Sequence, residues 1–412
     1  MERRLGTPDA VAVGLATMIG AGVFVAFAPA ARASGDLLLL ALAIAVVVAG
    51  LNAHSSARLA ARYAESGGAY VYGRERLGTP WGHLAGWAFV VGKTASSAAM
   101  ALTVGAYLAP GRSTSLAVVV VLAVLALNLL GVQRSARAAT VIAAVVIAGL
   151  LAFVAVMLLA PPELLVESAP RSDPVGVLGV LQGAGFLFFA FAGYARIATL
   201  GEEVRDPARA IPRAVLIALS AVAVIYLLVA VALLRSVGSE WLSARVSPLA
   251  EAAEISGVPW LGPVLRVVAG VAATGALLAL LLGVSRTVLA MARDRYLPHL
   301  LARVDQRGVP VAAELSVALA VVLLVVLFDV RAVIGFSSVC VLAYYAIANA
   351  SAATLPAGAL ARSIPVLGMI GCLVVALALP LTSLVSGVLV LLVGAATGWL
   401  SHTARTAGGE GG

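Results

Sequence analysis

The stretch Ile19-Gly20-Ala21-Gly22-Val23-Phe24 lies in the middle of the first long apolar run of the chain. Two glycines one residue apart weaken a helix, because each costs about 1 kcal/mol relative to alanine. Glycine is also common where membrane helices pack closely. Taken alone, the stretch therefore leaves two interpretations open, a packing contact or an interruption that exposes backbone groups.

The composition around this stretch points to a membrane as the main solvent. The chain has 412 residues, of which 62% are hydrophobic and 11% are charged, whereas a soluble domain averages about 25% charged residues. A membrane-crossing helix needs roughly 20 apolar residues, so the chain has room for about a dozen spans and for no large soluble domain. The runs do not alternate polar and apolar residues as barrel strands would, which favours helices.

Apolar runs between charged or Pro/Gly-rich breaks predict the spans. They lie near residues 8–30, 37–59, 82–108, 115–133, 138–160, 175–200, 212–235, 259–285, 312–328, 331–352, 363–379 and 381–400. We expect an amphipathic stretch at 61–80, an outer helix at 239–257 and a long basic loop at 286–310. The fold class is therefore all-α integral membrane with 12 transmembrane helices.

The arginines predict the orientation. The formal charge is +8, and the basic residues gather in alternate short loops, as in the positive-inside rule rather than in a nucleic-acid-binding stripe. This pattern predicts a multi-pass protein of the cytoplasmic (inner) membrane with both termini in the cytoplasm. The first run lacks a small-residue cleavage site, so we interpret it as a retained span rather than a signal peptide.

The sixth run has its own weak point at Phe191-Ala192-Gly193-Tyr194. The first and sixth spans correspond if the chain repeats a five-helix unit in opposite orientation. In such transporters two interrupted helices bind the substrate near the bilayer centre. Freed N–H groups attract a carboxylate, and freed carbonyls accept from an ammonium. The pairing of two weak points favours interruption over packing.

Four motifs in order carry a family resemblance: Gly14–Phe24, Glu65–Tyr72, Phe188–Pro212 and Ser285–Pro298. The chain resembles the amino acid–polyamine–organocation (APC) superfamily, in its amino-acid permease branch. The resemblance implies a LeuT-like fold with a 5+5 inverted repeat plus two peripheral helices. The expected units are 1–160 with a broken first span, 161–360 with a broken sixth span, and 361–412 with the peripheral helices and the cytoplasmic tail. It also implies secondary transport of amino acids by alternating access, proton-coupled or by exchange.

The resemblance also assigns substrate-binding residues. Ile19, Gly20, Ala21 and Gly22 would hold the substrate carboxylate. The other half of the expected site would face the substrate ammonium through Phe191, Ala192 and Gly193, with Tyr194 as an aromatic gate. Many members read Gly-Phe-Glu where this chain has Gly193-Tyr194-Ala195, and no acidic residue lies inside spans three, six, eight or ten. We therefore expect neutral amino acids rather than polyamines or basic amino acids.

Lys93 is the only lysine, about eleven residues into the third span and so roughly 16 Å deep. An ionisable group near the bilayer centre costs roughly 2.5–3.5 kcal/mol on insertion scales and suggests function. Lys93 fits a proton carrier, a counter-charge for an anionic substrate, or a structural cation in place of sodium; a lysine that snorkels or binds a carbonyl is the simpler alternative. We predict that Lys93 is the coupling group and the proton the coupling ion, with His54 as another titratable candidate.

Two loops supply candidate gating residues. The Glu202-Glu203 to Pro212 loop and the Arg293-Asp294-Arg295 loop predict ion-pair networks that close the inner side, although orientation and lipid contact would also explain these charges. Arg196 could join them by pairing with Glu202 or Glu203, or could face the substrate.

The sequence has no HExxH, GxSxG, Walker or Cys/His metal pattern, and Cys340 and Cys372 fit packing positions in apolar runs. We therefore predict no enzyme, cofactor or metal. The expected partners are an amino acid, the proton and the lipid bilayer, with no nucleic acid. The alternative function is a non-transporting membrane sensor or channel subunit on the same scaffold.

Overall fold

The structure, a computed structural model, describes residues 6–63, 67–131, 136–159, 175–198, 204–356 and 358–409. Helices form throughout these ranges, and no strand occurs within them. Within these ranges, eleven helical segments are long and apolar enough to cross a membrane, and a shorter apolar helix lies at Val311–Leu327. The expected all-helical membrane architecture is therefore confirmed.

The long helices follow the predicted runs closely. In chain order they are α4 (Leu38–Arg62), α6 (Thr79–Leu108), α7 (Ser113–Leu129), α8 (Ala136–Leu159), α9 (Val177–Phe191), α11 (Pro207–Ser236), α14 (Leu261–Arg293), α15 (Val311–Leu327), α16 (Val330–Ala353), α17 (Ala359–Ala378) and α18 (Leu381–Gly409).

The first apolar run is not one helix. It consists of α1 (Thr7–Met18), the four-residue α2 (Gly22–Val25) and α3 (Phe27–Ser34), and residues 19–21 between α1 and α2 are not helical. The paired glycines fall at this break, as their low helix propensity predicts. The sixth run is also interrupted, since α9 ends at Phe191 and a 3₁₀ turn over Ala192–Tyr194 (η4) separates it from α10 (Ala195–Ala198).

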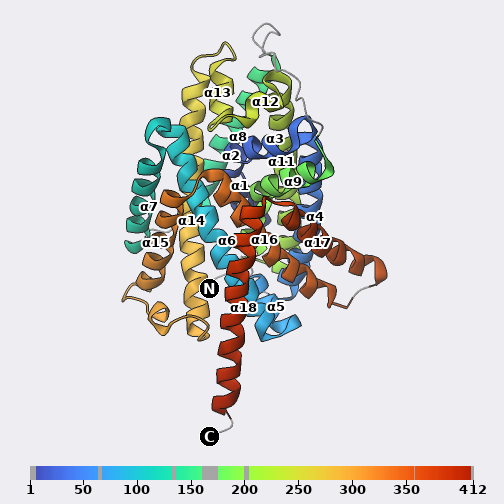
Figure 1. Ribbon diagram of the computed structural model, residues 1–412, viewed down its shortest axis with the longest axis vertical. Coiled ribbons are helices and arrows are strands. Elements are labelled where there is room, and N and C mark those ends of the chain that lie inside the picture. Colours follow the sequence, from blue (N-terminus) through green and yellow to red (C-terminus); the bar gives the residue numbers. More distant parts are fainter. Residues whose placement is uncertain are drawn as a thin grey trace.

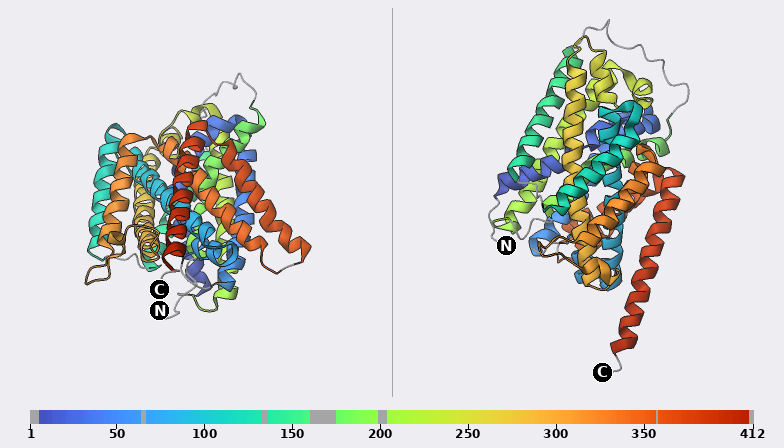
Figure 2. Two further views of the ribbon diagram at one scale, coloured as in Figure 1. Left: turned by 60° about the horizontal axis from the view of Figure 1, so that its bottom comes forward. Right: turned by 90° about the vertical axis from the view of Figure 1, so that its left-hand side faces the viewer.

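The helices pack as one bundle around α6, which contacts α14 on one side and α16 on another (Figure 1). Alanine, glycine and serine make up much of the buried face of α6, so neighbouring backbones approach closely; a Cβ on Gly92 would lie 3.0 Å from the Cβ of Cys340. The short α5 (Ala69–Leu77) and the end of α18 lie at one end of the bundle, opposite α12 (Gly238–Ser243) and α13 (Pro248–Glu254), as both figures show (Figure 2).

Two segments differ in detail from the sequence predictions. The outer helix expected at 239–257 is two short helices, α12 and α13, because proline at 248 begins a new helix. The basic loop expected at 286–310 begins later, since α14 continues to Arg293. A charged residue such as Arg286 indicates where a helix leaves the apolar environment, but the helix itself can continue beyond that residue.

Candidate functional site

The two interruptions lie against each other. The hydroxyl of Thr17, at the end of α1, donates to the carbonyl of Gly193 in η4 over 3.1 Å. A Cβ on Gly193 would lie 2.4 Å from the Thr17 carbonyl oxygen, and a Cβ on Gly22 would lie 2.6 Å from the Cα of Ala190. At both glycines, therefore, two backbones approach too closely to leave room for a side chain. The glycines serve close packing and also mark the interruptions, so both interpretations of the sequence apply.

The eight predicted substrate-binding residues form two facing groups. All are buried except Gly193, which is half-buried; they are Ile19, Gly20, Ala21, Gly22, Phe191, Ala192, Gly193 and Tyr194. The structure thus brings together the two stretches that the sequence paired.

Carbonyls at the breaks accept hydrogen bonds from side chains of other helices. Tyr226 of α11 donates to the Met18 carbonyl over 2.6 Å, with the Ala190 carbonyl at 3.3 Å. The Ala192 carbonyl has two donors nearby, the ammonium of Lys93 at 3.1 Å and the hydroxyl of Tyr345 at 3.3 Å. The loss of helical hydrogen bonding is therefore partly offset by tertiary contacts.

The backbone amides at the first break are less satisfied than the carbonyls. Phe24 donates to the Ala21 carbonyl and Ile19 to the Leu15 carbonyl, but the described residues provide no acceptor for the amides of Gly20, Ala21 and Gly22. Amides that lack acceptors suit a carboxylate.

Lys93 lies beside the site but belongs to α6. Its side chain is 7% exposed, and its ammonium bonds the Ala192 carbonyl. The described ion pairs do not include Lys93, and the residues around it on α6 are neutral, with Ser97 donating to its carbonyl. The carbonyl contact that the sequence left as an alternative is present, and it connects Lys93 to the second break.

Tyr194 packs in an aromatic cluster. Its fully buried ring stacks on Tyr345 with centroids 5.0 Å apart, and Tyr345 contacts Tyr344 edge to face. Tyr345 therefore reaches the second break through both its ring and its hydroxyl. Thr17, Tyr226 and Tyr345 were not predicted from the sequence as site residues. The available signal was the presence of polar side chains in the middle of apolar runs.

The candidate gating residues have different surroundings. Asp294 accepts a hydrogen bond from Tyr70 of α5 and has the Arg74 guanidinium at 3.6 Å, so it links α5 to the end of α14. Burial, and then the hydrogen bond to Asp294, raise the pKa of Tyr70, which keeps this hydroxyl a donor. Arg293 and Arg196 are exposed. Glu202 and Glu203 lie outside the described residues.

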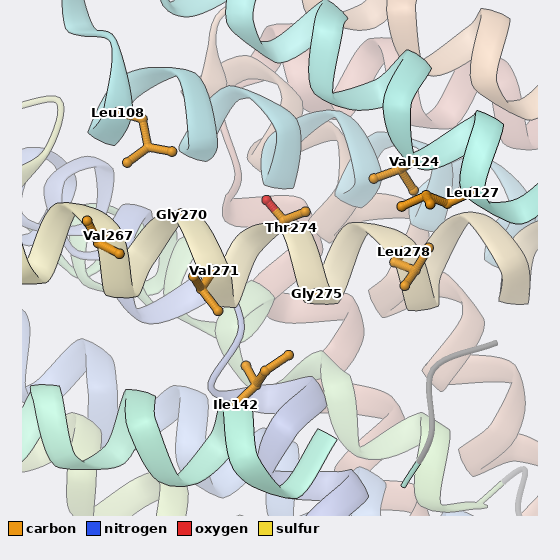
Figure 3. A pocket seen from close by; sticks show the side chains of 10 residues that line it. All are labelled: Leu108, Val124, Leu127, Ile142, Val267, Gly270, Val271, Thr274, Gly275 and Leu278. Atoms are coloured by element: carbon orange, nitrogen blue, oxygen red, sulfur yellow. The ribbon is translucent and has the colours of Figure 1, made fainter. Parts of the chain in front are cut away.

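An apolar cavity of about 480 Å³ lies apart from the breaks, between α6, α7, α8 and α14 (Figure 3). Aliphatic residues line it, and Thr274 provides its single polar side chain. It has no charged group to hold a zwitterion. Among the described residues, no three metal-ligating side chains come together.

The comparisons with known proteins assign the family. The model of the amino acid permease family matches residues 9–355. The chain belongs to this family. It is 57% identical to an uncharacterized transporter of Mycobacterium tuberculosis, over 96% of this chain and 90% of that protein. It is 28% identical to the mitochondrial cationic amino acid transporter 3 of Arabidopsis thaliana, over 82% of this chain and 60% of that protein.

A human relative extends this similarity. Cationic amino acid transporter 4 of Homo sapiens is 29% identical over 84% of this chain and 58% of its own length. The chain thus spans about three fifths of these plant and human proteins. The family's activity is transmembrane transport of amino acids, and the protein is a transporter with many membrane-spanning helices.

Proposed function

We propose that the protein is a secondary active permease that carries amino acids across the cytoplasmic membrane by alternating access. The observation that carries this proposal is the contact between two interrupted helices at Thr17–Gly193 and at Gly22–Ala190. Unpaired backbone groups inside a membrane protein cost several kcal/mol unless a ligand or a side chain satisfies them. A helix interruption inside the membrane is therefore best explained by a ligand that pairs with the exposed backbone groups.

The substrate would lie between the two breaks. Its carboxylate would accept from the amides of Gly20, Ala21 and Gly22, next to Ile19, whose own amide bonds the Leu15 carbonyl. Its ammonium would face Phe191, Ala192 and Gly193. The Lys93 ammonium at the Ala192 carbonyl supports this polarity, because that oxygen already accepts from a cationic amine. The buried ring of Tyr194 would act as the aromatic gate.

The proposal also includes the inverted repeat, the orientation in the membrane, the inner gate and the coupling ion. Residues 1–160 and 161–360 would form two inverted five-helix units, and 361–412 the peripheral pair. With the arginine-rich loops inside, both termini and α5 are cytoplasmic, and Asp294 with Tyr70 and Arg74 would close that side. We propose that the proton is the coupling ion and Lys93 the group that carries it.

Uptake into proteoliposomes tests the proposal. Purified protein is reconstituted, and accumulation of labelled alanine or serine is measured with and without an inward proton gradient, beside counterflow against unlabelled substrate. Gradient-driven accumulation supports a coupled permease, and counterflow alone supports an exchanger. Neither activity across a panel of neutral, acidic and basic amino acids would overturn the transport proposal.

A further inference from the structure

A fully buried carboxyl group lies outside the candidate substrate site, where α7, α14 and α15 meet. Glu314, in the first turn of α15, has 0% exposure. The three helices contact one another and lie side by side (Figure 1). The facing residues Ser285 of α14 and Asn128 of α7 are also buried. The transport proposal gives this cluster no role.

The cluster can accommodate an ionised carboxylate. The Ser285 hydroxyl donates to Oε1 of Glu314 over 2.6 Å, and Nδ2 of Asn128 donates to Oε2 over 3.3 Å. Each oxygen thus has one donor, and each donor comes from a different helix. An ionised carboxylate only accepts hydrogen bonds, so both contacts fit this state.

The same cluster can accommodate the protonated acid. Ser285 Oγ lies 3.1 Å from the Leu282 carbonyl oxygen, and one hydroxyl proton cannot serve both this carbonyl and Glu314. A proton on Oε1 would donate to Ser285, whose own proton would turn to Leu282. Oδ1 of Asn128 is buried without a partner among the described residues. In the alternative protonated form, the proton lies on Oε2. After rotation of the Asn128 amide, this O–H group would donate to Oδ1 of Asn128.

The charges around Glu314 leave the ionised form without a paired cation. The described ion pairs do not include Glu314. Among the described residues, the charge that acts on it is Arg286 of α14, which is exposed. Packed against α15 are also α6 and η5 (His299–Ala302). The titratable side chains of these two elements are His83, Lys93, Tyr107 and His299. None of them has an electrostatic interaction with Glu314 comparable to that of Arg286. Proton uptake would remove the cost of burying this charge.

From these contacts we propose that Glu314, with Ser285 and Asn128, is a proton-binding site separate from the substrate site. It takes one proton from water to become a neutral carboxylic acid and releases it again. The helix α14 connects it to the first break, since a Cβ on Gly20 would lie 2.9 Å from the Cβ of Ala276. Ser285 is nine residues farther along α14, or about 13.5 Å. Resting on the proposed function, the site makes the transport rate depend on its protonation.

Infrared difference spectroscopy on the full-length protein in lipid tests proton binding without reference to transport. Spectra are taken through a pH titration for the wild type, for Glu314→Gln and for the control Glu240→Gln, which alters an exposed carboxylate. We expect a protonated-carboxyl C=O band that titrates in the wild type and the control and is missing in Glu314→Gln. A titration unchanged by Glu314→Gln in folded protein would overturn the site.

Asn128→Leu provides a second variant that keeps the carboxyl group. The protonated acid would lose its hydrogen bond with the Asn128 amide, whether its C=O group accepts that bond or its O–H group donates it, so its C=O band should move to higher frequency. An unmoved band would overturn the assignment of Asn128 as a partner. In proteoliposomes, Glu314→Gln mimics the protonated acid and should hold the exchange rate constant across the pH range in which the wild-type band titrates. A rate that still follows pH as in the wild type would overturn the link to transport. If no variant transports any amino acid, the proposed function fails while the infrared result stands.

Discussion

The ammonium of Lys93 donates to the carbonyl of Ala192 over 3.1 Å, which joins the middle of α6 to the interruption in the sixth apolar run. The only lysine of the chain thus occupies the acceptor at which we place the substrate ammonium. A substrate bound there has to share or displace this contact. In the proposed site, substrate binding and the state of Lys93 would therefore be coupled through one oxygen atom.

Replacement of Lys93 should separate coupling from exchange. Lys93→Ala is expected to abolish proton-driven accumulation while counterflow continues, because the site persists without its titratable group. Lys93→Arg should stall net transport, since a guanidinium does not deprotonate in proteins. Gradient-driven uptake and counterflow are measured in the same proteoliposomes. Full accumulation by Lys93→Ala would make the lysine structural and leave His54 as the next candidate.

Gly22→Leu should abolish substrate binding while the protein still inserts. Even the Cβ would lie 2.6 Å from the Cα of Ala190, and backbone atoms cannot turn aside as a flexible side chain can. The matched control is Gly50→Leu on α4, where an added Cβ meets nothing within 4 Å. Binding is measured as the ligand-induced rise in Tm. Wild-type affinity in Gly22→Leu would separate the break from the binding site.

Thr17→Val should destabilise the protein by about 1 kcal/mol more than a similar change elsewhere, because it removes a hydrogen bond between the two breaks. Thr103→Val is the control, since within the described part of the chain the Thr103 hydroxyl bonds only the Ala99 carbonyl of its own helix. The single Thr17 hydroxyl proton also has the Val13 and Gly14 carbonyls of its own helix within reach, at 2.9 and 3.0 Å. The difference between the variants therefore measures what the third acceptor, the Gly193 carbonyl, adds. Thermal unfolding in detergent measures it, and equal losses would argue that this contact contributes no stability.

Local sequence signals predicted the helices and the breaks, because glycine weakens a helix wherever it stands. The apolar runs therefore gave the spans, and Gly20 and Gly22 gave the first interruption. The ends of elements were less predictable: α14 runs past Arg286, and the outer segment divides at Pro248.

Contacts between side chains of distant helices were not predictable in this way. Tyr226 and Tyr345 reach carbonyls on distant segments, and Glu314 meets Asn128 across 186 positions. Such contacts depend on how helices pack, and a single sequence carries no signal for the pairing. Lys93 was conspicuous because it is unique, but its partner Ala192 became visible only in the structure.

Tyr70→Phe should make the bundle open more readily at the end where α5 meets α14. The variant removes the donor to Asp294. Because burial raises the pKa of Tyr70, its hydroxyl stays protonated at physiological pH, and the contact should be insensitive to pH there. The measurement is the alkylation rate of the buried Cys340 in a Cys372→Ala background. Arg209→Gln, which breaks an exposed ion pair, is the control. An unchanged rate in Tyr70→Phe would contradict a gating role for Asp294.

The last prediction concerns substrate charge. The plant and human relatives are named cationic amino acid transporters. In this structure, by contrast, the polar side chains that bond carbonyls at the breaks belong to Lys93, a threonine and tyrosines, and none is a carboxylate. A cationic side chain buried there without a carboxylate would cost several kcal/mol. Alanine and serine should therefore compete for uptake more strongly than arginine, agmatine or putrescine.

Ala195 provides the sharpest form of this test, because the resemblance to amino-acid permeases leads us to expect a glutamate at this position after Gly193-Tyr194. Ala195 is buried beside the second break. Ala195→Glu should increase competition by arginine through a new buried charge pair, and Ala195→Gln, similar in size but neutral, should not. Competition against labelled alanine is measured for the three proteins at one pH. If arginine already competes with the wild type as strongly as alanine does, the cation has a partner outside these contacts and the chain shares the substrates of its named relatives. If Ala195→Glu and Ala195→Gln behave alike, charge at this position does not select the substrate.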